Sequence, residues 1–249
     1  MKKRYIKHSL LALGILLFFS AGAYFALYEG YIRLNYPSFY TYPIHGLDIS
    51  HHQDEIDWNK LDKRYSQFIF IKATEGATHK DSRFEEYRTQ ARAHNIPVGA
   101  YHFFTFCKSG KEQAINFMET VPIDSCDLPP AIDLEFDGNC NKANHKENLL
   151  YEITEYIDII ETYYNKRVII YATSEFYKKY IANNFKDNPI WFRNVYSKPK
   201  LENNRQWSFW QYTNRGRISG INSFVDINTW AGTRKEFYDF INSNIQKKE

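Results

Sequence analysis

Short apolar segments alternate with longer segments of helical periodicity over most of the chain, and this alternation restricts the possible folds more than any other feature. The apolar segments predict strands at 44–49, 68–73, 98–104, 131–136 and 168–172. Helical patterns lie between them, at 56–64, 82–94, 111–120 and 146–165. Strands that alternate with helices form a parallel sheet, and so many units in succession favour closure into a barrel.

Beyond residue 172 the segments become shorter and more irregular. Strands separated by loops are predicted at 189–195, 206–212 and 223–227. We therefore predict the α/β fold class and a single modified (β/α) barrel, with about five βα units followed by three less regular strands. The barrel domain is assigned to residues 43–249, in which we find no internal repeat and no second domain.

Residues 1–28 have the pattern of a membrane anchor or a signal peptide. A basic stretch precedes an uncharged apolar run over 9–27, close to the ~20 residues that a helix needs to cross a bilayer. Ala21-Gly22-Ala23 is a possible cleavage site, but the apolar run continues beyond it, which favours an uncleaved anchor. In both cases the basic flank stays in the cytoplasm and the rest is exported, either membrane-anchored on the periplasmic or extracellular side or, after cleavage, secreted. Residues 29–42 form a predicted tether that spans at most about 50 Å when extended.

The charge balance argues against a nucleic acid partner. The chain holds 32 Lys and Arg against 29 Asp and Glu, a formal charge of +3. Lys2, Lys3, Arg4 and Lys7 belong to the N-terminal segment, so the exported part is close to neutral, whereas a nucleic-acid-binding domain is usually distinctly basic. The chain also has 20 tyrosines, 19 phenylalanines and 5 tryptophans, more than its core requires. Some of these aromatic rings are expected at a surface, where they suit the faces of sugar rings.

The predicted strand at 131–136 carries two acids on one face. Side chains alternate along a strand, so Asp133 and Glu135 point to the same side while the apolar residues between and around them pack on the other. Two acids on one face of a buried strand are costly unless they do chemistry or hold a cation. Their mutual repulsion raises one pKa and leaves the other group ionised, which suits a general acid beside a carboxylate partner. A solvated strand end or an ion pair is the alternative.

Polar and aromatic residues also end the other predicted strands. In parallel barrels the carboxyl ends of the strands meet at the functional face. The residues read at these ends are Asp48, Lys72, Glu75, Tyr101, His102, Asp133, Glu135, Tyr171, Trp191, Gln211 and Asp226. Such a ring of acids and aromatics fits a carbohydrate site. Within it, Lys72 and Glu75 are expected to form a supporting ion pair, and His102 to face away from the barrel axis.

Several sequence blocks around these strand ends carry a family resemblance. The blocks are Gly46-Leu47-Asp48-Ile49-Ser50 with Gln53, Ile56-Asp57-Trp58, Phe70-Ile71-Lys72-Ala73-Thr74-Glu75-Gly76, Val98-Gly99-Ala100-Tyr101-His102-Phe103, Leu128-Pro129-Pro130-Ala131-Ile132-Asp133-Leu134-Glu135, Trp210-Gln211-Tyr212 and Val225-Asp226-Ile227-Asn228. They resemble the family 25 glycoside hydrolases, the lysozyme-like N-acetylmuramidases, and follow the order of that family over roughly residues 46–230. Any one block is a weak signal, but together and in order they are a strong one.

The resemblance implies hydrolysis of the β-1,4 bond between N-acetylmuramic acid and N-acetylglucosamine in peptidoglycan. Glu135 would be the general acid that protonates the leaving oxygen. Asp133 would be its carboxylate partner, which holds Glu135 and the substrate N-acetyl group or stabilises positive charge at the anomeric carbon. Asp48 and Asp226 would complete the acidic floor. Retaining, inverting and substrate-assisted mechanisms all stay open.

The resemblance also implies a set of substrate-binding residues. Tyr101 would place its hydroxyl near the cleaved sugar, Gln211 would be a polar contact in the groove, and Tyr171 belongs to the same set. Trp191 is expected as a platform for a sugar ring or as part of the core. Arg193 stands where the family often has a small residue, so its guanidinium could pair with lactyl or peptide carboxylates or lie on the surface.

Two other functions are weighed against the muramidase. A non-catalytic peptidoglycan-binding protein would have little reason to keep four buried acids. A glycosidase with chitin or glucosaminidase specificity is the nearer alternative. The expected partners are peptidoglycan glycan strands and, through the N-terminal segment, the membrane. No cofactor and no metal are predicted, because the adjacent His51 and His52 would face opposite ways at a strand end.

Three cysteines complete the sequence-based predictions. Cys107 and Cys140 each follow the carboxyl end of neighbouring strands, so they should meet at one rim of the barrel. Cys126 precedes its strand and should lie nearer the other rim. We therefore predict a Cys107–Cys140 disulfide and an unpaired Cys126, since disulfides are permitted in an exported protein.

Overall fold

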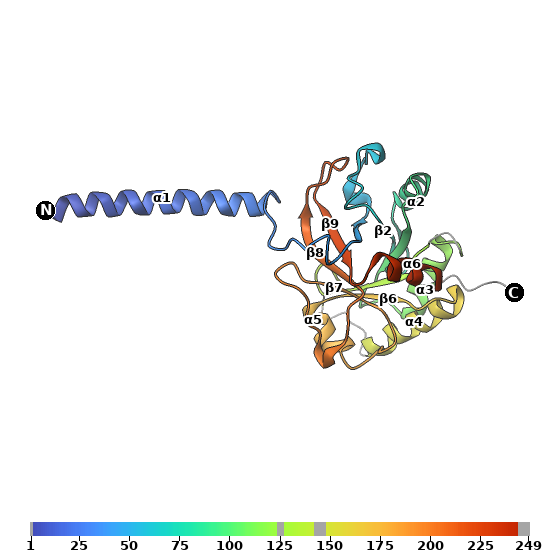
Figure 1. The fold of residues 1–249 in the computed structure, drawn as a ribbon. Coiled ribbons are helices and arrows are strands. Elements are labelled where there is room, and N and C mark those ends of the chain that lie inside the picture. The colour runs from blue at the N-terminus through green and yellow to red at the C-terminus, as the bar shows by residue number, and fades with distance from the viewer. Residues whose placement is uncertain (1, 124–126, 142–147, 244–249) are drawn as a thin grey trace.

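A computed structural model describes residues 2–123, 127–141 and 148–243 and shows a closed barrel with a long helix projecting from it (Figure 1). The strand order is β1-β9-β8-β7-β6-β5-β4-β2-β3, and a further pairing of β1 with β2 closes the sheet. The barrel strands are β1 (His45–Ile49), β2 (Ile69–Glu75), β4 (Val98–Phe103), β5 (Ala131–Leu134), β6 (Ile169–Thr173), β7 (Ile190–Arg193), β8 (Phe209–Gly216) and β9 (Val225–Trp230). The short β3 (His79–Lys80) only extends β2 as a hairpin.

The helices of the barrel lie in the connections between the strands. They are α2 (Phe84–Ala93), α3 (Gly110–Thr120), α4 (Leu149–Tyr164), the short α5 (Ser174–Phe176) with the π-helical η4 (Tyr177–Ile181), and α6 (Arg234–Ser243). Short 3-10 turns are η1 (His51–Gln53), η2 (Trp58–Lys60) and η5 (Glu202–Asn204). The predicted α/β barrel, regular at first and irregular toward its end, is confirmed.

One predicted helix is wrong, and one helix of the structure was not predicted. The helix expected at 56–64 is only the 3-10 turn η2, because Ile56 forms a β-bridge with Ile221 and the chain is extended again at Leu61. The helix α6 was not predicted from the sequence. Its Phe237 and Ile241 are buried with Ile44 and Phe68, which precede the first two barrel strands, so α6 packs at the amino-terminal end of the barrel.

The last strand runs against the others. Strands β1, β2 and β4–β8 pair in parallel, whereas β9 is antiparallel to both β8 and β1. The connection between β8 and β9, residues 217–224, is too short for a helical crossover, which is why these two strands form a hairpin.

Side chains of the parallel strands alternate between two cores. On β2 and the residue before it, Phe68 and Phe70 belong to the cluster inside the barrel, while Ile69 and Ile71 pack outward against the helices. Inside the barrel, Phe70 stacks on Trp191 with ring centroids 4.5 Å apart. Burial on both faces is what a parallel strand requires, and it explains the unbroken apolar runs of the sequence.

The N-terminal helix α1 (Lys2–Tyr28) extends away from the barrel (Figure 1). Its segment His8–Tyr28 has a mean hydropathy of 2.2 and is long and apolar enough to cross a membrane, and none of it is buried against the protein. The chain after the helix packs on the barrel. The Arg215 guanidinium donates to the Tyr28 carbonyl at 2.6 Å, Arg217 pairs with Glu29 at 2.8 Å, and Asn35 donates to the Val195 carbonyl at 2.6 Å. Several residues directly after the helix thus contact the barrel.

The packing of α3 on α4 can be tested at the point where their backbones come closest. Gly110 begins α3 directly against the backbone of α4, where a Cβ atom would meet the carbonyl of Glu152. We expect Gly110→Ala to lower the free energy of unfolding by about 1–3 kcal/mol, because two packed helices must separate to admit the methyl group. Urea denaturation measures this. Lys111→Ala, at the exposed next position of the same helix, should change stability far less, and an equal loss in both variants would contradict the packing argument.

Candidate active site

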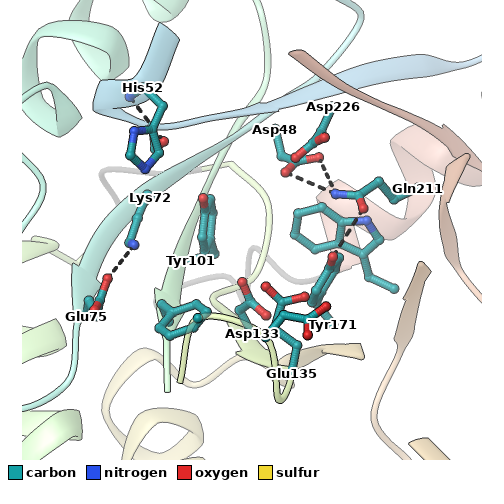
Figure 2. Close-up of a pocket in the computed structure, with 15 residues that line it drawn as sticks. Asp48, His52, Lys72, Glu75, Tyr101, Asp133, Glu135, Tyr171, Gln211 and Asp226 are labelled. Carbon is teal, nitrogen blue, oxygen red and sulfur yellow. Dashed lines mark hydrogen bonds and ion pairs between the residues drawn. The ribbon is translucent and has the colours of Figure 1, made fainter. Parts of the chain in front are cut away.

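A pocket of about 410 Å³ opens at the carboxyl ends of the parallel strands (Figure 2). It is lined by Asp48, Ser50, His52, Lys72, Glu75, Tyr101, Phe103, Asp133, Glu135, Asp137, Gly138, Tyr171, Trp191, Gln211 and Asp226. All eight residues predicted for catalysis or substrate binding are in this set. These eight side chains come from seven different strands or the loops that follow them.

Asp48 and Asp226 face each other where the first and last strands of the barrel pair. They are register partners across β1 and β9, and their carboxyl groups share a hydrogen bond. Burial raises the pKa of both, and the neighbouring Asp48 charge raises that of Asp226 well above its usual range. Asn228 and Gln211 donate hydrogen bonds to Asp48, at 2.7 Å and 3.1 Å, which partly offset the effect of burial. The shared hydrogen bond raises the pKa of Asp226 and lowers that of Asp48, so Asp226 keeps its proton more readily than Asp48 does.

Asp133 and Glu135 lie together on the opposite side of the pocket (Figure 2). Burial raises the pKa of Glu135 to about 7, with Asp137 and Asp48 adding to the rise and Arg193 and Lys72 opposing it. The pKa of Asp133 is raised well above its ordinary value by burial and by the charge of Glu135. The two carboxyl groups thus hold a proton between them at neutral pH. Glu135, just past the end of β5, is the more exposed of the two.

Gln211 is in the pocket, but its side chain is already engaged on both sides. Its amide nitrogen donates to both Asp48 oxygens, at 3.2 Å and 3.1 Å, and its amide oxygen accepts from the Tyr171 hydroxyl at 3.1 Å. The role of Gln211 as a polar contact for the substrate stays a prediction. Gln211 and Tyr171 form a chain of hydrogen bonds that orients Asp48.

Trp191 lines the pocket and is also packed into the core of the barrel. Only 1% of the residue is exposed, one ring face stacks on Phe70, and the indole nitrogen donates to Asn228 at 2.7 Å. Tyr101 is the more accessible ring, packed edge-on against Trp191 at 6.3 Å. Burial, reinforced by the nearby acids, raises the pKa of Tyr101 well above 10, so its hydroxyl stays protonated and can donate to a substrate.

Asn228 is the most informative residue that the sequence analysis did not assign. Its side chain links Asp48 to Trp191, by donating to the first and accepting from the second. The signal was available, because Asn228 follows Asp226 by two residues on a strand and must share its face. Asp137, Gly138 and Phe103 were also not assigned, and they line the pocket from loops and strand ends.

Several supporting predictions can be compared with the structure. Lys72 and Glu75 form the expected ion pair at 2.6 Å. His102 is buried, bonded to Thr74 and Gln113, and burial lowers its pKa to about 3, so it is neutral and faces away from the pocket. The described part of the chain contains no group of three or more His, Cys, Asp or Glu side chains that could hold a metal ion.

The predicted disulfide is not formed. The side chains of Cys107 and Cys140 meet as expected, but as two thiols joined by a hydrogen bond, and burial together with this bond raises the pKa of Cys140 to about 11. The prediction placed the pair correctly and assigned the wrong bond. Cys126 lies outside the described residues.

This chain is similar in sequence and fold to several known proteins. A model of glycosyl hydrolases family 25 matches residues 47–221. The Escherichia coli K12 protein YegX is 34% identical over 206 residues, which cover 81% of this chain and 74% of that protein. Lysozyme M1 of Streptomyces globisporus is 30% identical over 206 residues, 78% of this chain and 69% of its own. The solved structure of a family 25 glycosyl hydrolase from Bacillus anthracis matches with a TM-score of 0.74 and 41% identity, over 80% of this chain and 94% of that one. The chain belongs to glycosyl hydrolase family 25.

The hydrogen bonds to Asp48 predict a pH effect. We expect Asn228→Ala to lower kcat by about 10-fold and to move the acidic limb of the pH profile upward, because the lost donor had offset part of the rise in the Asp48 pKa that burial causes. Kinetics of glycoside hydrolysis between pH 4 and 8 measure both changes.

A matched control removes another buried amide. Asn188 bonds to Glu161 and to the Val168 carbonyl, and does not line the pocket. Asn188→Ala should reduce stability and leave the pH profile in place. If the profile moved equally in both variants, the bond from Asn228 would not be what sets the Asp48 charge.

Proposed function

We propose that this protein is a muramidase that cleaves the β-1,4 bond after N-acetylmuramic acid in peptidoglycan, with Glu135 as its general acid. The observation that carries the proposal is the Asp133–Glu135 pair in a pocket lined by four further carboxyl groups. Burial raises the pKa of Glu135 to about 7, as a general acid requires. Family membership and the similarity to Lysozyme M1 support the same activity.

The proton needed by the leaving group comes from the Asp133–Glu135 pair. A glycosidic oxygen leaves only when it is protonated, so the donor must retain its proton at the working pH. Glu135 is the donor because it is the more exposed of the two and stands beyond the strand end, where a glycan can reach it. After the transfer the pair carries an additional negative charge next to the bond that has broken.

Positive charge develops on the sugar as the bond breaks, and the remaining acids stabilise it. Asp48 is placed to supply this negative charge, since hydrogen bonds from three side chains orient it and oppose the rise in its pKa that burial causes. The Oδ1 atom of Asp133 is buried and has no hydrogen-bond partner among the residues that the structure describes. That atom is suited to hold the N-acetyl group of the bound sugar, directly beside the reacting carbon.

The first test is turnover of purified peptidoglycan by the full chain in detergent, beside its Glu135→Gln variant. We expect fragments with muramic acid at the reducing end, identified by mass spectrometry, and a loss of kcat by several orders of magnitude in the variant. Fragments with N-acetylglucosamine at the reducing end would show that the enzyme is a glucosaminidase and not a muramidase. Binding of peptidoglycan without any turnover would indicate a non-catalytic wall-binding protein.

The same variant predicts a pH-dependent gain in stability. The folded-state pKa of Glu135, about 7, exceeds its ordinary value of 4.5, so the wild type loses stability as the pH rises between these values. Glutamine carries no charge, and we expect Glu135→Gln to be more stable than wild type at pH 8 by on the order of 1–3 kcal/mol, with little difference at pH 4. Thermal denaturation at both pH values measures this.

An exposed acid supplies the control for this stability measurement. Glu55 is exposed and lies outside the pocket, so Glu55→Gln should leave the difference between pH 4 and pH 8 unchanged. A Glu135→Gln effect of the same size at both pH values would mean that the glutamine acts through packing and not through the buried charge.

We further propose that the N-terminal helix is retained and anchors the enzyme in the membrane. The helix continues unbroken past the possible cleavage site at Ala21-Gly22-Ala23, and the barrel binds the residues that follow it. Arg215 stacks over the Tyr28 ring at 4.4 Å and Arg217 over Tyr31 at 4.6 Å. Arg215 lies in β8 and Arg217 in the connection to β9, which begins one residue before Asp226, so the anchor is attached at the end of the barrel that carries the pocket.

Retention of the anchor predicts a specific outcome in cells. The full-length protein should remain in the membrane fraction after carbonate extraction, and its intact mass should include the first 23 residues. A soluble protein that begins at Tyr24 would show instead that the segment is a signal peptide.

A further inference from the structure

A second pocket, of about 570 Å³, adjoins the catalytic one. It is formed by the loop after β5, the start of α5 and the loop after β7, and Asp137 lines both pockets. Its outer wall is held in place by Asn194, whose side-chain oxygen accepts from the backbone nitrogens of Tyr196 and Ser197, at 3.0 Å and 3.1 Å. The second pocket is thus a built recess that continues the catalytic groove.

Arg193 is the cation of this second pocket. It ends β7, where it pairs in register with Thr173 of β6 and with Gln211 of β8, a residue of the catalytic pocket. Its side chain is half-buried, yet within residues 2–123, 127–141 and 148–243 it makes no hydrogen bond or ion pair. By contrast, Arg88 and Arg167 each hold a carboxylate, at 2.5 Å and 2.6 Å. A half-buried guanidinium is costly unless anions offset the burial. The charges of Glu135, Asp226 and Asp137 do so for Arg193 from a distance, which leaves its hydrogen-bond donors available to a bound anion.

We propose that the second pocket binds a carboxylate carried by the muramyl residue, and that Arg193 is the residue that binds it. The inference rests on the proposed muramidase function. Of the two sugars of the glycan, only the muramyl unit bears an acidic substituent: a lactyl ether, ending in a free carboxylate or in a stem peptide with carboxylates of its own. A guanidinium binds carboxylates through two parallel hydrogen bonds. Occupation of the second pocket would therefore fix which sugar stands at the catalytic acid.

A purely electrostatic role of Arg193 is the competing explanation, because its charge also reaches Glu135. Its removal should shift the basic limb of the pH profile under either explanation, but a purely electrostatic effect would not depend on the charge of the glycan. A carboxylate-binding role changes KM, and only for glycans that carry the anion. The two roles thus differ in measurable ways.

The experiment compares Arg193→Ala and Arg193→Lys with wild type on three glycans. They are peptidoglycan fragments with stem peptides, the same glycan stripped to free lactyl carboxylates, and the stripped glycan with those carboxylates converted to neutral methylamides. For Arg193→Ala we expect KM to rise about 10-fold or more on the anionic glycans, with a smaller change in kcat and no change in KM on the neutral one. Arg193→Lys should recover part of the loss.

The first two glycans distinguish the sources of the carboxylate. A KM effect that persists on the stripped glycan assigns the lactyl group, and one confined to the first glycan assigns the stem peptide. Lys198→Ala is the charge control, since Lys198 is exposed and follows the second pocket by one residue. Equal KM changes on neutral and anionic glycans, or the same change in Lys198→Ala, would overturn the proposal.

A binding measurement separates this proposal from the muramidase itself. Muramyl dipeptide is titrated by calorimetry into the Glu135→Gln variant, with and without Arg193→Ala. Weaker binding in the double variant supports the carboxylate site even if no turnover is found, whereas unchanged binding refutes the site even if the wild type is an active muramidase.

Discussion

The carboxyl pair Asp48–Asp226 lies where the barrel closes, and the active site depends on the direction of the strand that closes it. Because β9 is antiparallel, its amino end lies at the face where the parallel strands have their carboxyl ends. Asp226 is the second residue of β9 and therefore reaches the catalytic pocket. A parallel last strand would have placed that aspartate at the opposite face, and Asp48 would have had no partner with which to share a proton.

Much of the site could be predicted because it follows from short-range geometry. The two-residue spacing of Asp133 and Glu135 predicts a common face, and strand ends predict which residues meet, since both rules need only the local periodicity. Asp226 was predicted for a wrong reason, as the carboxyl end of the last strand, whereas it lies near the amino end of an antiparallel one. Asp226 nevertheless lines the pocket, because either reading places it next to a loop at this face of the barrel.

What the sequence did not predict depends on contacts between distant segments. The burial of Trp191 is decided by Phe70 and Asn228, and the engagement of Gln211 by Asp48 and Tyr171, none of which is near in sequence. The packing of residues 28–35 on the barrel likewise depends on arginines almost 190 positions away. Periodicity predicts which face of a helix or strand is buried, but not which side chain of another element packs against that face.

The two cations near Glu135 differ in a way that links binding to proton transfer. Both lower its pKa, but Lys72 is held by Glu75 at 2.6 Å, whereas Arg193 faces the second pocket. A substrate carboxylate bound to Arg193 would neutralise much of its effect on Glu135, so the pKa of the acid would rise when the correct sugar is in place. By linkage, protonation of Glu135 and binding of the anion then favour each other. An enzyme built in this way keeps its acid partly ionised while empty and protonates it on binding the glycan that it cleaves.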